Sequence, residues 1–194
     1  NIEHFLYVSS DAVYNLEQKK ISNKTSPSPT DLYGLMHLSR ENICSFKISK
    51  KKLTILRPTI VYGKGDTHNS YGPNRFIGQL NNNSNIKIFG KGLDVRDHLY
   101  VDDLISAIMK SIKYEGKHNI FNIGMGKSYS VNEVINIIQE ELKSNLIVKT
   151  KKESRKMEIM ETVADINLAR KELGWEPNYS FKEGIKLLVE KLST

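Results

Sequence analysis

The sequence predicts an α/β fold with a parallel sheet, because strand and helix signals alternate from one end of the chain to the other. Short apolar runs such as residues 5–8 and 53–56 have the length of buried strands, whereas other stretches carry apolar residues at helical intervals. Ser130 and Ser180 are each followed three positions later by glutamate, a pattern that opens helices. The 194 residues allow one domain, or one domain with a small appended lobe.

The individual elements follow from local signals. Thr30 or Asp31 can cap the first helix, Pro58 stops the second strand, and Asp165 can cap a short helix near the carboxyl end. Residues 63–73 form a long loop rich in Gly, Asn and His, and this loop marks a soft boundary. The expected strands are residues 5–8, 53–56, 86–89, 119–123, 146–150 and 159–163. The expected helices are residues 31–49, 101–112, 131–142 and 181–192, with a short one at residues 76–80.

Composition and charge exclude several classes of protein. Contents of 39% hydrophobic and 26% charged residues are typical of a soluble globular protein. No apolar stretch approaches the ~20 residues that span a bilayer, and no secretory leader is visible, so we expect no membrane partner and a cytoplasmic location. The net charge of +7 is scattered and lacks nucleic-acid-binding motifs, so we expect no nucleic-acid partner. The five histidines lack metal-ligand spacing, so no metal site is expected.

Polar side chains follow the first strand and open the helix behind it. Ser9, Ser10 and Asp11 come where the strand ends, and Tyr33 lies near the start of the helix with His37 one turn further on. A serine and a tyrosine in these places could together hold a substrate hydroxyl or carbonyl. The alternative is that the serines only cap the end of the strand.

Three longer motifs follow. The second strand ends in R-P-T-I-V-Y-G (residues 57–63), and Y-G-P-N-R-F (residues 71–76) comes soon after it. The third motif is G-K-G-L-D-V-R-D-H-L-Y-V-D-D (residues 90–103). A simple surface loop does not explain this density of glycine, proline and asparagine beside arginines.

Together with the tail A-D-I-N-L-A-R-K-E-L-G-W-E-P (residues 164–177), these motifs resemble those of the extended short-chain dehydrogenase/reductase family. That family includes NAD-dependent nucleotide-sugar epimerases and dehydratases. The resemblance implies the second half of a Rossmann-like parallel sheet, with a small mixed α/β substrate-binding lobe. It assigns residues 1–65 to the dinucleotide-binding domain, with 100–125 returning to it, and residues 66–99 and 126–194 mainly to the lobe. Trp175 would pack the last helices against the lobe.

The resemblance also implies roles for single residues. Tyr33 would give or take the proton at the reacting sugar oxygen, which Ser10 would hold by a hydrogen bond. Asp11 matches one acidic residue of the dehydratases, but Ala12 stands where they have a glutamate, which favours epimerisation over dehydration. The implied contacts with NAD are Ser9, Tyr33, His37 and Pro58. The implied contacts with the nucleoside-diphosphate sugar are Asn74, Arg96 and Arg155, the arginines because a guanidinium can bind two phosphate oxygens at once.

Two departures from the family pattern shape the functional hypotheses. His37 occupies the position of the family's lysine; an unperturbed phenol has a pKa of ~10 and needs a nearby cation to ionise, whereas imidazole is mostly neutral at pH 7. Gly34 is the first glycine of the chain, so no glycine-rich loop for the cofactor diphosphate occurs, and the first half of the dinucleotide-binding fold is expected to be absent.

The chain is thus either a substrate-binding part of an epimerase or dehydratase, or an inactive remnant. Its expected partners are a separately encoded N-terminal half or a second copy of the chain.

Overall fold

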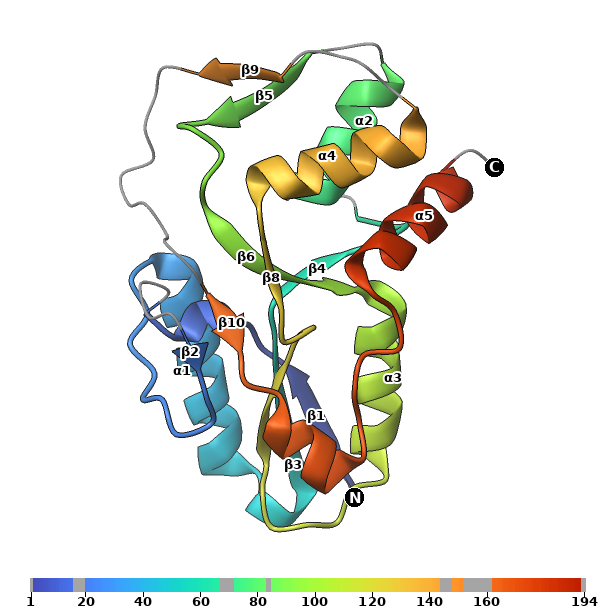
Figure 1. Ribbon diagram of the computed structural model, residues 1–194. Coiled ribbons are helices and arrows are strands. Elements are labelled where there is room, and N and C mark those ends of the chain that lie inside the picture. The colour runs from blue at the N-terminus through green and yellow to red at the C-terminus, as the bar shows by residue number, and fades with distance from the viewer. Residues whose placement is uncertain are drawn as a thin grey trace.

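The computed structural model describes residues 2–15, 20–66, 72–82, 85–143, 148–151 and 162–192. Figure 1 shows two parts, one built around a parallel sheet near the N-terminus and a lobe that contains the C-terminal helix. None of the helices in the described ranges is long and apolar enough to cross a membrane.

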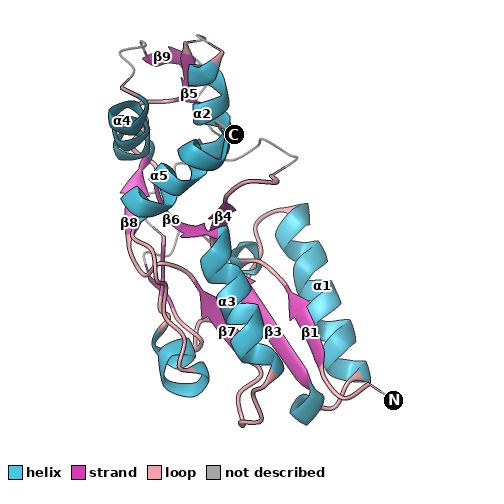
Figure 2. Ribbon diagram, turned by 90° about the vertical axis from the view of Figure 1, so that its right-hand side faces the viewer, coloured by secondary structure: helices cyan, strands magenta, loops and turns pink. Residues whose placement is uncertain are grey.

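A parallel sheet forms the first part. Its strand order is β1 (Phe5–Val8), β3 (Leu53–Pro58), β7 (Ile120–Ile123), and all pairings are parallel. Every residue of the central strand β3 is buried, as its continuous apolar run predicted. Figures 1 and 2 show helices α1 (Leu32–Lys47) and α3 (Val101–Ile112) beside these strands, and both contact β3.

The lobe is mixed. Strands β4 (Ile60–Tyr62), β6 (Val95–Tyr100) and β8 (Ser128–Ser130) form a second sheet in which β6 pairs parallel with β4 and antiparallel with β8. Its helices are α2 (Gly72–Asn81), α4 (Val131–Leu142) and α5 (Phe181–Leu192), and β5 (Ile86–Phe89) pairs parallel with β9 (Val148–Lys151). The remaining elements are short: η1 (Asp11–Val13), β2 (Lys20–Ile21), η2 (Lys50–Lys52), β10 (Val163–Ala164) and η3 (Ala169–Leu173).

Each part has its own apolar core. In the lobe, buried side chains of α2, α4 and α5, among them Phe76, Ile135 and Phe181, pack together. In the sheet part, Leu56 and Phe121 of the strands form the second core.

Trp175 belongs to the core of the sheet part and is fully buried there, so the expectation that it packs against the lobe is wrong. Its indole Nε1 donates hydrogen bonds to the Asp103 carbonyl, 3.1 Å away, and to Ser106 Oγ, 2.8 Å away. The indole therefore packs the C-terminal segment against α3, because its only polar atom finds acceptors on that helix.

Most predicted elements are confirmed, with shifted ends. Asp31 caps α1 by accepting from Gly34 N, and the capping box at Ser130 is complete. Helix α2 begins at Gly72, four residues before the predicted start, and β4, β6 and β8 were not predicted. The strand predicted at residues 159–163 lies largely outside the described residues.

Candidate active site

One pocket, of about 280 Å³, brings together residues from distant parts of the sequence. It lies where β1 and β3 end, because the carboxyl ends of adjacent parallel strands meet at the same edge of a sheet. The residues that line it are Ser9, Ser10, Asp11, Ala12, Asp31, Tyr33, Pro58, Thr59, Ile60, Val61 and Arg96. Six residues predicted for the site from the sequence are therefore neighbours in space: Ser9, Ser10, Asp11, Tyr33, Pro58 and Arg96.

Local backbone contacts place Ser10 and Tyr33. Ser10 caps η1, since its hydroxyl accepts from Ala12 N at 3.2 Å. Tyr33 lies in the first turn of α1, and a methyl group on its neighbour Gly34 would lie 2.0 Å from the Ala12 carbonyl oxygen. Only glycine lets α1 approach η1 this closely, so this residue allows the phenol and the serine to share one pocket.

The charged residues that line the pocket are Asp11, Asp31 and Arg96. Burial raises the pKa of Asp11 to about 6, while the positive charge of Arg96 and a hydrogen bond from Ser10 act in the opposite direction. Ser10 Oγ donates to Asp11 Oδ1 at 3.3 Å. The pocket thus holds a carboxyl group that can change its protonation close to neutral pH, next to a serine and a guanidinium.

Asp97 fastens the strands behind the pocket. Its carboxylate accepts from the backbone N–H groups of Met125, Gly126 and Ala164 at 2.8, 3.0 and 3.4 Å, and from Thr59 Oγ1 at 3.4 Å. Burial raises the pKa of Asp97 to about 7, although the three N–H donors oppose that shift. The Asp97 side chain therefore connects strand β6 to the segment that follows β7, through Met125 and Gly126, and to β10, through Ala164.

His37 packs beside Tyr33, and it is not among the pocket-lining residues. Its ring centroid lies 4.6 Å from that of Tyr33 in an edge-on arrangement, and its Nδ1 lies 2.8 Å from the Tyr7 hydroxyl. Burial, together with the charge of Arg40, lowers the pKa of His37, so the imidazole is neutral at pH 7. A neutral ring gives the Tyr33 phenol no positive charge.

Asn74, a predicted substrate contact, does not line this pocket. The buried side chain of Asn74 in α2 accepts from Gly63 N at 3.2 Å and donates to Gly63 O at 2.7 Å, which ties α2 to the end of β4. Its role at a substrate stays a prediction. Arg155 lies outside the described residues.

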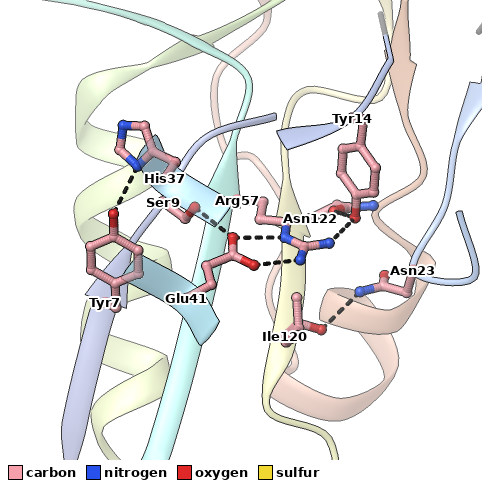
Figure 3. Close-up of polar contacts among 9 residues, drawn as sticks. All are labelled: Tyr7, Ser9, Tyr14, Asn23, His37, Glu41, Arg57, Ile120 and Asn122. Carbon is pink, nitrogen blue, oxygen red and sulfur yellow. Dashed lines mark hydrogen bonds and ion pairs between the residues drawn. The ribbon is translucent and has the colours of Figure 1, made fainter. Parts of the chain in front are cut away.

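A buried polar network behind the pocket was missed (Figure 3). The Glu41 carboxylate of α1 accepts a hydrogen bond from Ser9 Oγ at 2.5 Å and forms a bidentate ion pair with Arg57. Arg57 Nη1 also donates a hydrogen bond to Tyr14 OH at 2.7 Å. Tyr14 in turn donates to Asn122 of β7 at 2.8 Å. A signal was present: Glu41 lies one further helical turn beyond Tyr33 and His37, on the face that meets the sheet.

Residues 1–124 match the NAD dependent epimerase/dehydratase family. The chain belongs to this family. The fold agrees, since the solved UDP-glucose 4-epimerase of Thermotoga maritima, with UDP-glucose, superposes with a TM-score of 0.89 at 29% identity over 98% of this chain and 63% of that one. The UDP-glucuronic acid 4-epimerase of Bacillus cereus, with UDP-glucuronic acid and NAD, gives a TM-score of 0.87 at 25% identity over 98% and 62% of the two chains.

Two curated relatives match nearly the whole of this chain. The dTDP-4-dehydro-6-deoxyglucose reductase of Escherichia coli is 30% identical over 98% of this chain and 61% of its own length. A putative UDP-glucose 4-epimerase of Methanocaldococcus jannaschii is 32% identical over 97% of this chain and 63% of its own. The chain therefore spans less than two thirds of these relatives. The Rossmann-like α/β fold predicted from the sequence is confirmed.

Proposed function

We propose that this chain supplies the sugar-binding and proton-transfer residues of an NAD-dependent nucleotide-sugar epimerase. The observation that carries the proposal is the pocket shared by Ser10, Tyr33, Pro58 and Arg96, which come from four separate segments of the chain. The relatives point the same way, since several are described as acting on UDP- or dTDP-sugars.

Each residue has a chemical task in this proposal. Tyr33 holds or takes the proton of a sugar hydroxyl, and Ser10 donates a hydrogen bond to the same oxygen. Arg96 faces the diphosphate, where a guanidinium binds two oxygens at once. Asp11 stands near the sugar and is followed by Ala12 at the position where the dehydratases have a glutamate, and this favours epimerisation over dehydration.

The pocket fits the reacting ends of two ligands rather than two whole ligands. Its volume of about 280 Å³ lies at the lower limit of the ~300–1,000 Å³ that holds a complete small molecule. Pro58 offers a flat apolar surface suited to a nicotinamide ring. NAD, when bound, would supply the hydride acceptor of the reaction, and its diphosphate requires a glycine-rich loop that this sequence does not contain.

A second candidate function is binding of a nucleotide sugar without turnover. The observation in its favour is the neutral, buried His37 beside Tyr33, where the family pattern has a permanently charged lysine. A neutral imidazole supplies no positive charge to stabilise negative charge that develops on the neighbouring tyrosine oxygen during proton transfer.

Calorimetry on this polypeptide tests the shared part of both candidates. We expect UDP-glucose or dTDP-glucose to bind, and Arg96→Ala to weaken binding by about ten- to a hundredfold, because one charge-assisted phosphate contact is worth ~1.5–3 kcal/mol. Arg170→Ala is the matched control, since Arg170 is half exposed and pairs with Glu176. Equal affinity in the wild type and Arg96→Ala would contradict the assignment of Arg96. We expect no measurable NAD affinity for this polypeptide.

Turnover separates the two candidates. We expect His37→Lys to raise epimerase turnover when a nucleotide-binding half from a relative is supplied, since an ammonium group beside Tyr33 favours the phenolate. The assay is interconversion of UDP-glucose and UDP-galactose, with NAD present. Turnover in His37→Lys but none in the wild type supports binding without catalysis for the natural chain. Wild-type turnover that equals or exceeds the variant's shows that histidine is a working substitute.

A further inference from the structure

Helix α1 meets the sheet through polar contacts, and Tyr33 depends on that helix for its position. The buried residues of α1 are Gly34, His37 and Glu41, and none of them has an apolar side chain. The apolar Leu38 is only partly buried and packs against Val13, Tyr14 and Ile21 rather than against the strands of the sheet. Leu35 and Phe46 of the same helix are exposed. Apolar packing is not directional, whereas hydrogen bonds and ion pairs require a particular geometry.

The Glu41 carboxylate joins the elements that form the pocket (Figure 3). It accepts from Ser9 Oγ at 2.5 Å, from Arg57 Nε at 2.9 Å and from Arg57 Nη2 at 2.5 Å. Ser9 precedes Ser10 at the end of β1, and Arg57 precedes Pro58 at the end of β3. One side chain thus holds three elements whose neighbouring residues line the pocket.

Through Arg57 the network also reaches a fourth element that contributes residues to the pocket, the short helix η1. Its guanidinium lies over the Tyr14 ring, 4.8 Å from the centroid, and donates to the hydroxyl of that tyrosine. Tyr14 directly follows η1, which contains Asp11 and Ala12. Both Glu41 and Arg57 are almost completely buried, at 2% and 5% exposure.

A buried ion pair is weak evidence for stability, because well-packed apolar side chains of the same volume often stabilise a fold equally well. What the charged pair adds is a fixed geometry, since the planar guanidinium and the carboxylate match only in one arrangement. We infer that Glu41 is a positioning residue of the candidate active site, which fixes the α1 helix and Tyr33 relative to Ser10. This inference rests on the proposed function, in which these two residues hold the same sugar oxygen.

The test combines two measurements on Glu41→Gln, which keeps the volume but removes the charge. The first is hydrogen exchange at the amides of residues 34–37, where Gly34 N and Leu35 N donate to Asp31. We expect exchange there to rise about tenfold, while α4 and α5 in the lobe stay protected. Glu140→Gln is the matched control, since the Glu140 carboxylate is exposed and pairs with Lys182 on the lobe surface.

The second measurement compares the affinities for UDP and UDP-glucose. We expect Glu41→Gln to bind UDP within about twofold of the wild type and to bind UDP-glucose about tenfold more weakly, because the sugar contacts alone are misplaced. If Glu41→Gln does not fold, Glu41→Asp carries the same test, since it keeps a charge beside Arg57 but shortens the side chain by one methylene.

The outcomes separate the inference from the proposed function. A uniform rise of exchange throughout the chain, or a rise confined to the residues around position 41, overturns the positioning role. A wild-type protein that binds neither UDP nor UDP-glucose counts against the proposed function, and the exchange measurement then decides the inference by itself. A variant that keeps the full preference for UDP-glucose over UDP also overturns it.

Discussion

Replacing Gly34 by alanine tests how closely α1 must approach η1. The added methyl group would lie 2.0 Å from the Ala12 carbonyl oxygen and 2.8 Å from its carbonyl carbon. Those are backbone atoms, so neither can turn aside as a flexible side chain would. To reach an ordinary contact distance of 3.4 Å or more, the helix or η1 must shift by more than 1 Å, and Tyr33 and Ser10 shift with them.

The expected cost follows from two opposing effects. Alanine favours a helix over glycine by up to about 1 kcal/mol. Overpacking against a rigid neighbour costs about 3 kcal/mol, so we expect a net loss of about 2 kcal/mol in the free energy of unfolding. For a chain of this size that loss lowers the melting temperature by about 4–8 °C.

Gly78→Ala is the matched control, because a methyl group at Gly78 in α2 meets nothing within 4 Å. We expect it to stabilise the protein by up to about 1 kcal/mol. Urea unfolding followed by circular dichroism measures both variants. If Gly34→Ala is as stable as Gly78→Ala, the close approach of α1 to η1 is not a constraint and the reasoning fails.

Two further substitutions test the buried polar contacts. The pKa of Asp97 is about 7 in the folded chain, against ~3.9 in an unfolded one. Between about pH 4 and about pH 7 the folded state therefore binds more protons than the unfolded state, so the free energy of unfolding falls as the pH rises through this range. Asp97→Asn should flatten that dependence in denaturant melts, and an unchanged slope would show that the carboxyl does not titrate there. Trp175→Phe removes the donor to Asp103 and Ser106 and should cost about 2 kcal/mol. Lys191→Ala, at an exposed ion pair with Asp102, should cost clearly less, because solvent screens that pair. Thermal melts of both variants decide, and equal losses would refute the role given to the indole.

The elements that the sequence predicted well are those with strong local signals. Residues 5–8 are an apolar run, residues 86–89 carry apolar side chains on both sides of Lys87, and both segments are bounded by polar or glycine residues. Both form strands with the predicted ends. The capping pattern at Ser130 opened α4 as expected because it acts within one helical turn. Asp31 at the start of α1 behaves in the same way.

The missed strands depend on partners that are distant in the sequence. Residues 95–100 contain Arg96, Asp97 and His98, a polar run that local propensity does not mark as a strand. They form β6 because β4 and β8 pair with the two sides of it and Asp97 finds backbone donors on other segments.

In the candidate site, too, the residues that belong to sequence motifs were predicted, and a residue that depends on distant contacts was missed. Motif resemblance selected Ser10, Tyr33, Pro58 and Arg96, and these residues do lie together. The carboxylate that joins their elements, Glu41, was not selected, because its importance comes from Ser9 and Arg57, which approach it only in the folded chain.

The way in which the chain alternates between its two apolar cores affects how the molecule unfolds. Successive segments belong to the sheet part, then the lobe, then the sheet part again, and the last stretch leaves Trp175 in one core and supplies Phe181 to the other. No single cut of the polypeptide could excise either core as an intact piece. If a protease cleaves one of the segments that connect the sheet part to the lobe, the other connecting segments still join the two parts. We therefore expect both cores to unfold together in one cooperative step.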